Sequence, residues 1–383
     1  MTAAFDTPER RTLRETVHRF VQADVLPYQS VWEAEGELPR SLHLRAAAAG
    51  LIGLAYPTAA GGGGGNAVDS LVLAEAFHET GGASGVFASL FTSGISLPHL
   101  VAAGDAHQVE KWVRPTIEGR LIGSLAITEP DGGSDVAGIR TTARRDGDDY
   151  VVNGVKTYIT SGVRADFVVT AVRTGAAGAH GISLLVVEKG TPGFTVANRL
   201  AKMGWLASDT AELSYADVRV PVANLVGAEN SGFVQIAQNF ASERVGLAVQ
   251  SYACAQRCLD LTVEWCRARE TFGRPLISRQ AVQNTLTEMA RRIEVARVYT
   301  RSVAARAAQG ETNLIREACF AKNTAVEAGQ WVADQAVQLH GGMGYMRESE
   351  VERQYRDMRI MGIGGGTTEI LTGLAAKTLG YTS

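Results

Sequence analysis

Apolar side chains recur at steps of three and four residues through roughly the first 110 positions of the chain. Two such series are Leu13, Val17, Phe20 and Val21, and then Leu71, Leu73, Ala76 and Phe77. This spacing lines one face of a helix, so it predicts a helical N-terminal domain over residues 1–120. Pro39, Pro57 and five glycines at 61–65 interrupt the pattern, and we expect surface loops there.

From 121 to 226 the period changes to two. Short β-rich runs bounded by Gly, Pro or Asp-Gly lie at 167–169, 184–187, 194–196 and 218–220. They predict a compact antiparallel β domain, a barrel or a sandwich. Within it, Asn153-Gly154 separates two apolar runs, and this dipeptide favours a two-residue hairpin turn.

Helical spacing returns in residues 227–383. The clearest stripe is Val282, Leu286, Met289, Ile293, Ala296 and Val303. Other long helical segments run over 233–268, 313–340 and 348–379, the last with a break at 364–366. Four long helices joined by short loops predict a four-helix bundle, so the fold class is α+β.

The amino-acid composition argues against some classes of function. The chain has 383 residues, 45% hydrophobic and 20% charged, with a formal net charge of -3 and a pI near 6.2. This balance gives no electrostatic case for nucleic acid or an anionic membrane as partner. We see no secretory signal and no apolar run of the roughly 18 to 20 residues that span a bilayer, and we expect a cytoplasmic protein.

Four cysteines lie in predicted helices, and Cys254 and Cys258 share one helix face. No histidine lies near them in sequence, and small buried thiols are common in cores. We therefore expect core packing and no metal site.

The segment most suggestive of chemistry begins with TEPDGGSD at 128–135 and continues with NGVKTYITSG at 153–162. Its small residues let a ligand approach the backbone closely. Thr128, Ser134 and Thr160 carry hydroxyls that can donate to ring carbonyls or phosphate oxygens. By itself the first part also fits a plain glycine-rich connection between strands.

Together, the two parts resemble the flavin-binding segment of the acyl-CoA dehydrogenase family. Three further segments resemble family motifs in the same order: ARETFGRPL at 268–276, VQLHGGMGY at 337–345 and RDMRIMGIGGGTTEI at 356–370. The resemblance covers nearly the whole chain. It implies the family's α, β, α order of domains, an FAD cofactor and a homo-oligomer, a tetramer arranged as a dimer of dimers.

The resemblance also implies a role for individual cofactor-binding residues. Those around the flavin ring and pyrophosphate would be Thr128, Ser134, Tyr158 and Thr160. Those holding the adenosine half from a neighbouring subunit would be Arg269, Phe272, Gln338, Gly341 and Gly342. Those closing the pocket near the cofactor would be Thr367 and Glu369.

The family removes an α-proton and a β-hydride from an acyl thioester, which requires a carboxylate base. Many members carry this Glu directly before Gly-Thr, where this chain has Gly365. A subgroup, as in isovaleryl-CoA and long-chain acyl-CoA dehydrogenases, places the Glu before an Arg on the first bundle helix, and Glu243-Arg244 stands there. A lone Glu-Arg pair is ordinarily a surface pair. We expect Glu243 to be the base, the N–H of Gly365 to bind the thioester carbonyl, and Ser134 and Arg244 to contact substrate.

The substrate carrier and the electron acceptor stay open. Ala241 replaces an acidic residue found in members that bind free coenzyme A, so the acyl group is carried by coenzyme A or by a carrier protein. The resemblance implies an electron-transfer flavoprotein as acceptor. One alternative is an oxidase or monooxygenase that uses dioxygen, and the other is a relative without flavin or catalysis. Flavin absorbance of the purified protein distinguishes the flavin-free alternative from the two enzymes.

Overall fold

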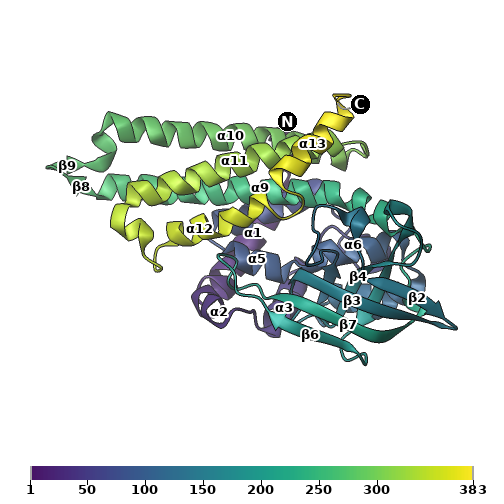
Figure 1. Cartoon of the computed structure of the whole chain (residues 1–383). Helices are drawn as coiled ribbons and strands as arrows, with labels where there is room; N and C mark the ends of the chain where they lie inside the picture. Colours follow the sequence, from purple (N-terminus) through teal and green to yellow (C-terminus); the bar gives the residue numbers. More distant parts are fainter. Residues whose placement is uncertain (1, 382–383) are drawn as a thin grey trace.

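Three regions follow one another in the computed structural model, which describes residues 2–381 (Figure 1). The first is helical. Its helices are α1 (Pro8–Phe20), α2 (Gln29–Glu35), α3 (Arg40–Ala48), α4 (Ala67–Glu79), α5 (Ser84–Leu90), α6 (Ser93–Ala103), α7 (Ala106–Gln108) and α8 (Arg114–Ile117). Asn66 begins α4 with a capping box, in which its side chain accepts from Val68 N–H and Asp69 accepts from its backbone N–H. The predicted N-terminal helices are present.

The middle region is one curled sheet. Its strands are β1 (Gly123–Ala126), β2 (Thr142–Asp146), β3 (Asp149–Thr160), β4 (Phe167–Arg173), β5 (Ile182–Glu188), β6 (Phe194–Arg199) and β7 (Thr210–Pro221). The order is β1-β4-β2-β3-β7-β6, with β5 also paired to β4. Most neighbouring strands are antiparallel, as expected, but β1 and β2 pair with β4 in parallel.

The predicted hairpin at Asn153-Gly154 is wrong, because β3 runs straight through both residues. The turn lies earlier, where Gly147 (φ 64°) joins β2 to β3. At Asn153 the partner strand β7 carries one extra residue, and Asn153 exchanges two hydrogen bonds with Asp217 (φ 51°) across this bulge. Gly154 is required by packing instead: a Cβ there would lie 2.5 Å from Thr141 Oγ1.

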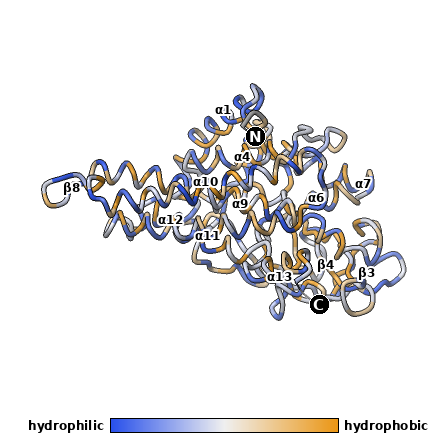
Figure 2. Tube along the Cα trace, turned by 90° about the horizontal axis from the view of Figure 1, so that it is seen from above, coloured by the Kyte–Doolittle hydropathy of each residue, from blue (hydrophilic) through white to orange (hydrophobic). Residues whose placement is uncertain are grey.

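The C-terminal region contains the expected bundle. Its helices are α9 (Gly232–Ala268), α10 (Gln280–Ala308), α11 (Ile315–His340), α12 (Glu350–Met358) and α13 (Thr368–Thr378). The predicted stripe on α10 is buried. A short hairpin, β8 (Glu270–Thr271) with β9 (Arg274–Pro275), projects from the end of the bundle away from the sheet in both views (Figures 1 and 2).

One buried carboxylate fastens the N-terminal region to the bundle. Glu75 on α4 is fully buried and accepts from Tyr252 on α9 at 2.7 Å. It also accepts from Arg14 on α1 and from both Nε and Nη2 of Arg301 on α10, each at 2.8 Å. Burial opposes the ionised form, but these donors lower the pKa of Glu75 overall. The group is therefore a structural ion network, in which two arginines compensate the charge of one buried carboxylate.

The glycine run forms the expected loop, and the cysteines have the expected buried positions. Residues 61–65 form a loop, anchored by hydrogen bonds from the N–H groups of Gly63 and Gly65 to the carbonyls of Gly53 and Leu54, both 2.9 Å long. All four cysteines are buried and free. Among residues 2–381 there is no group of three or more His, Cys, Asp or Glu side chains suited to a metal ion.

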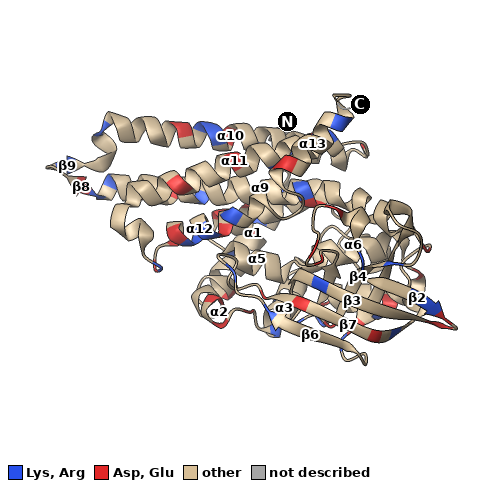
Figure 3. Cartoon of the chain, in the orientation of Figure 1, with Lys and Arg blue, Asp and Glu red and all other residues tan. Residues whose placement is uncertain are grey.

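Charged residues of both signs are mixed over the molecule. Figure 3 shows acidic and basic positions interspersed over both the bundle and the sheet.

One segment, Ser84–Ala103, has the length and composition of a membrane span, with a mean hydropathy of 1.5, so the expectation of no such run is wrong. The segment is broken between α5 and α6, and half of it is buried, with Leu97 and Leu100 in the core. Packing within the domain explains its composition.

The close packing of Gly154 beside the bulge at Asn153 predicts how a side chain at position 154 would change stability. Gly154→Ala should lower the free energy of unfolding by about 2 to 4 kcal/mol, because its Cβ would also lie 2.7 Å from the backbone Cα of Thr141. Thermal unfolding should show a lower midpoint. Gly147→Asn is the control, since Asn tolerates a left-handed conformation and nothing lies within 4 Å of the added Cβ. A loss in Gly154→Ala no larger than that in the control would contradict the close packing of Gly154 against Thr141.

Candidate active site

Strands β1 and β3 bring the two parts of the glycine-rich motif together. The Thr157 N–H donates to the carbonyl of Thr128 over 2.9 Å, and the Ser124 hydroxyl donates to the carbonyl of Thr160 over 2.6 Å. The loop after Thr128 folds back on it, since a Cβ at Gly133 would lie 3.3 Å from Thr128 Cγ2. The predicted neighbourhood of Thr128 and Thr160 is therefore present.

A buried ion pair fixes this arrangement. Lys156 Nζ lies 2.8 Å from Glu129 Oε1 and donates to the carbonyl of Ile127 over 2.9 Å. The Glu129 carboxylate also accepts from the backbone N–H groups of Arg140 and Thr141. Burial lowers the pKa of Lys156 to about 8, although Glu129 acts in the opposite direction. Lys156 and Glu129 hold the backbone on both sides of Thr128.

The side chains expected to contact a flavin have hydroxyl groups that are available for hydrogen bonding. Tyr158 sits in a second bulge with φ 59° and is 69% exposed, and Ser134 is exposed. Within residues 2–381 the hydroxyls of Thr128, Ser134, Tyr158 and Thr160 have no intramolecular hydrogen bond. An exposed aromatic ring beside uncommitted donors fits an aromatic, hydrogen-bonding cofactor such as FAD.

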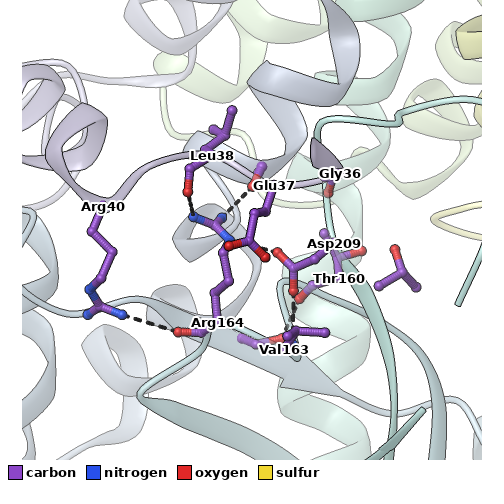
Figure 4. A network of polar contacts seen from close by, with 12 residues as sticks. Gly36, Glu37, Leu38, Arg40, Thr160, Val163, Arg164 and Asp209 are labelled. Carbon is purple, nitrogen blue, oxygen red and sulfur yellow. Dashed lines mark hydrogen bonds and ion pairs between the residues drawn. The ribbon is translucent and has the colours of Figure 1, made fainter. Parts of the chain in front are cut away.

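The chain beyond Thr160 is tied to the N-terminal region by a second buried ion pair (Figure 4). Arg164 Nε donates to Asp209 Oδ1 over 2.7 Å, and its Nη1 donates to the carbonyl of Leu38 over 2.9 Å. Asp209 accepts from the backbone N–H of Val163 at 2.9 Å. Because both charged groups are buried and partnered, they fix the end of β3 relative to the helical domain.

On the bundle, Glu243 and Gly365 meet, although 122 positions separate them in the numbering. Glu243 lies three turns into α9, and a Cβ added at Gly365 would lie 3.4 Å from Glu243 Oε1. Arg244 is buried, and its Nε donates to the carbonyl of Gly365 over 3.5 Å. The carboxylate of Glu243 therefore lies close to where a side chain at position 365 would be.

The carboxyl of Glu243 is in an environment that suits a base. Burial raises its pKa above the ordinary value, and the charges of Arg244 and Lys322 offset only part of this effect. A carboxylate with a raised pKa binds a proton more readily than one in water. No carboxylate competes for the position, because Gly365 has no side chain.

The loop after Gly365 offers a hydrogen-bond donor. In the part of the chain that the structure describes, the N–H of Gly365 has no intramolecular acceptor. Thr367 caps α13 by accepting from Ile370 N–H, and Glu369 is exposed in the first turn of that helix. Thr367 and Glu369 thus lie at the start of the helix that follows Gly365, and hydrogen bonding to the backbone and to Thr367 lowers the pKa of Glu369.

The remaining predicted residues lie elsewhere in the chain. Arg269 and Phe272 belong to the projecting β8-β9 arm, where Phe272 is 97% exposed (Figure 2). Gln338, Gly341 and Gly342 lie where α11 ends. Trp265 Nε1 near the end of α9 donates to the carbonyl of Leu339 on α11, so both groups lie at the end of the bundle that points away from the sheet (Figure 1).

Five buried charged side chains around the candidate site were not predicted from the sequence. They are the Lys156–Glu129 pair, the Arg164–Asp209 pair, and Lys322 on α11. Lys322 Nζ donates to the carbonyls of Gly364 and Gly366, the second over 2.5 Å. A usable signal existed for Lys322, since it stands three residues from both Cys319 and Ala325 on an apolar helix face.

Comparisons with known proteins agree with this geometry. Acyl-CoA dehydrogenase family models match the chain in order: the N-terminal domain at residues 7–120, the middle domain at 124–218 and the C-terminal domain at 230–380. The chain is 37% identical over 376 residues to the mitochondrial long-chain specific acyl-CoA dehydrogenase of Rattus norvegicus, covering 97% of this chain and 86% of that protein.

Solved structures are similar over the full length. A crystal structure assigned as an acyl-CoA dehydrogenase of Mycobacterium smegmatis is 68% identical, with a TM-score of 0.98 over 99% of this chain and 100% of that one. A glutaryl-CoA dehydrogenase of the same organism, in complex with FADH2, is 26% identical with a TM-score of 0.92, over 100% and 97% of the two chains. Fold and site define a three-domain protein of the flavoenzyme class. The chain belongs to the acyl-CoA dehydrogenase family.

The buried Lys156–Glu129 pair predicts that loss of Lys156 lowers both stability and FAD content. Lys156→Met should lower the free energy of unfolding by about 3 to 5 kcal/mol, because it leaves the Glu129 charge buried without a cation. It should also lower the FAD content of the purified protein, measured by absorbance, because Thr128 loses its support.

The double variant Lys156→Met with Glu129→Gln is the control and should recover part of the stability. If instead the two single losses add to within about 0.5 kcal/mol, the pair does not interact as described.

Proposed function

We propose that this protein catalyses FAD-dependent α,β-dehydrogenation of an acyl-CoA thioester, with Glu243 as the base. The observation that carries this proposal is the 3.4 Å separation between Glu243 Oε1 and the Cβ position of Gly365. A carboxylate on α9 reaches the place that a side chain at 365 would occupy. Membership of the acyl-CoA dehydrogenase family supports the reaction class.

In this mechanism Glu243 takes the α-proton while the N–H of Gly365 donates to the thioester carbonyl. Hydrogen bonding to that oxygen stabilises the negative charge that develops as the proton leaves, and so makes the α-proton more acidic. Burial keeps the pKa of Glu243 high, which strengthens it as a base once ionised. Arg244, which donates to the Gly365 carbonyl, holds the loop beside the substrate. FAD held at this site would supply the acceptor for the β-hydride.

The cofactor would be held in two halves. Thr128, Ser134, Tyr158 and Thr160 would surround the flavin ring and pyrophosphate, and Thr367 with Glu369 would close the pocket. The adenosine half would be held by Arg269, Phe272, Gln338, Gly341 and Gly342 of a neighbouring subunit. The projection of the β8-β9 arm away from the sheet supports a contribution across subunits, because the Phe272 ring is 97% exposed even though the Arg279 guanidinium lies over it, 5.2 Å from the ring centroid.

Partners and location follow as further parts of the proposal. We propose a tetramer, electron transfer to an electron-transfer flavoprotein and a cytoplasmic location. Coenzyme A is the proposed carrier, with the phosphopantetheine of a carrier protein as the alternative. These parts rest on the family and on the sequence, and each is separately testable.

The deciding experiment is a panel of acyl-CoA and acyl-carrier thioesters of different chain length and branching, with anaerobic bleaching of the flavin as the signal. Bleaching by acyl-CoA supports the proposal, and the fastest thioester defines the substrate. Rapid reoxidation by dioxygen with hydrogen peroxide formation would identify an oxidase. A colourless protein that binds no added FAD would support the flavin-free alternative.

The base assignment predicts the effect of Glu243→Gln. The amide keeps the shape and hydrogen bonding of the side chain but cannot take a proton, so flavin reduction should slow by a factor on the order of a thousand or more, while FAD stays bound. Stopped-flow absorbance under anaerobic conditions measures the rate. Glu369→Gln, at an exposed site, is the matched control and should retain far more activity. Equal rates for Glu243→Gln and the parent would refute the assignment.

The shared cofactor site predicts a link between assembly and FAD retention. Arg269→Ala should weaken FAD retention during gel filtration and change the unfolding midpoint little, because Arg269 is exposed on the arm. Arg267→Ala, exposed two residues earlier, is the control. Light scattering on the same samples reports the oligomer. An active, flavin-bound monomer would contradict the shared site.

A further inference from the structure

We infer that Lys322 is a positioning residue: it fixes the loop 364–366 that presents the Gly365 N–H, and it supplies a cation beside the ionised base. This inference rests on the proposed function, because it takes Glu243 as the base. Lys322 itself does not touch the reacting atoms.

The surroundings of Lys322 are unusual for a lysine. It lies about two turns into α11, is 1% exposed, and has Ala321, Ala325 and Val326 as buried neighbours on its helix. Within residues 2–381 it forms no ion pair, and its Nζ donates only to the carbonyls of Gly364 and Gly366. Burying an ammonium is costly unless the charge is compensated. A neutral donor would satisfy two carbonyls, so the charge itself calls for an explanation.

Three consecutive carbonyls of the loop are bound by cations. Lys322 binds those of Gly364 and Gly366, and Arg244 binds that of Gly365. The loop needs this support, because Gly365 (φ 64°) and Gly366 (φ 95°) both adopt left-handed backbone conformations. In a planar trans peptide, the C=O and the following N–H point in opposite directions. Holding the Gly364 carbonyl against Lys322 therefore turns the Gly365 N–H away from α11.

The charge of Lys322 balances the carboxylate of Glu243. The titratable groups that face this pocket are Glu243 and Arg244 from α9, and Cys319 and Lys322 from α11. Burial lowers the pKa of Lys322 to about 8, although Glu243 favours its charged form, so the ammonium is mostly protonated at neutral pH. Burial raises the pKa of Glu243, and Lys322 is one of two cations that oppose this rise. Without Lys322, the pKa of Glu243 should rise further.

A series at one position separates the charge from the hydrogen bonds. Lys322→Met removes both, Lys322→Gln keeps a donor without a charge, and Lys322→Arg keeps both. Lys377→Met, on the exposed face of α13, is the control. Each variant is examined as the FAD-loaded enzyme, with butanoyl-, octanoyl- or hexadecanoyl-CoA, whichever bleaches the parent fastest.

The first readout is the pH dependence of anaerobic flavin reduction. The base must be ionised, so the rate falls as the pH drops through the pKa of Glu243. Lys322→Gln and Lys322→Met should move this acid limb to higher pH by about one unit, as expected for loss of a nearby opposite charge. Lys322→Arg and Lys377→Met should leave it in place.

The second readout is hydrogen exchange of the backbone amides at 364–367 in the enzyme without substrate. Exchange should quicken about tenfold or more in Lys322→Met and less in Lys322→Gln, because only the glutamine still binds a carbonyl. An acid limb that stays in place in Lys322→Gln overturns the inference, and so does unchanged exchange in Lys322→Met. If Lys322→Met fails to fold, the comparison of Lys322→Gln with Lys322→Arg still decides. Failure of all three thioesters to bleach the parent would instead count against the proposed function.

Discussion

A carboxylate that removes a proton from carbon must sit where water is scarce and yet carry a charge. In this protein that constraint falls on Glu243, the proposed base. Burial disfavours its charged form and raises its pKa, and two cations, Arg244 and Lys322, compensate for part of this effect. Both cations also bind carbonyls of the loop that carries the Gly365 donor. One small set of side chains therefore adjusts the base and places the hydrogen-bond donor.

The rest of the fold holds this site together from three regions. Helix α9 carries Glu243, and the buried Glu75 network ties α9 and α10 to the N-terminal helices. In the sheet, the Lys156–Glu129 pair supports the loop around Thr128, and Arg164–Asp209 ties the end of β3 to the N-terminal region. These ion pairs are buried and fully partnered, so they favour one arrangement of the domains over looser ones.

The sequence predicted the regular elements well, because their hydrophobic periodicity reflects burial directly. The α10 stripe from Val282 to Val303 and the four β-rich runs all lie in the expected elements. The hairpin predicted at Asn153-Gly154 was wrong because the same dipeptide fits two structures. It suits a hairpin turn, and it also suits a bulge such as the one found here, where Gly154 packs against Thr141. The parallel pairing of β1 with β4 could not be predicted from local pattern, since it joins strands about forty residues apart.

The candidate site was predicted only in part. The resemblance predicted that positions 243 and 365 approach the same substrate atom, and the structure brings them to within 3.4 Å of each other, measured from Glu243 Oε1 to the Cβ position of Gly365. The role of Glu243 as base stays a prediction. Lys322 was missed, because a single lysine in a helix is normally a solvated side chain, and only its carbonyl partners on a distant loop reveal its position.

We propose that a carboxylate at position 243 and one at position 365 would reach the same substrate atom. Moving the base tests it most directly, by comparing anaerobic flavin reduction in Glu243→Gly with that in Glu243→Gly combined with Gly365→Glu. The new side chain must accept φ 64° and displace Leu247 Cδ1, which lies 2.6 Å from its Cβ position, so recovery will be partial. The account predicts that the double variant reduces its flavin at least tenfold faster than Glu243→Gly. A folded, FAD-loaded double variant that is no faster than Glu243→Gly would contradict it.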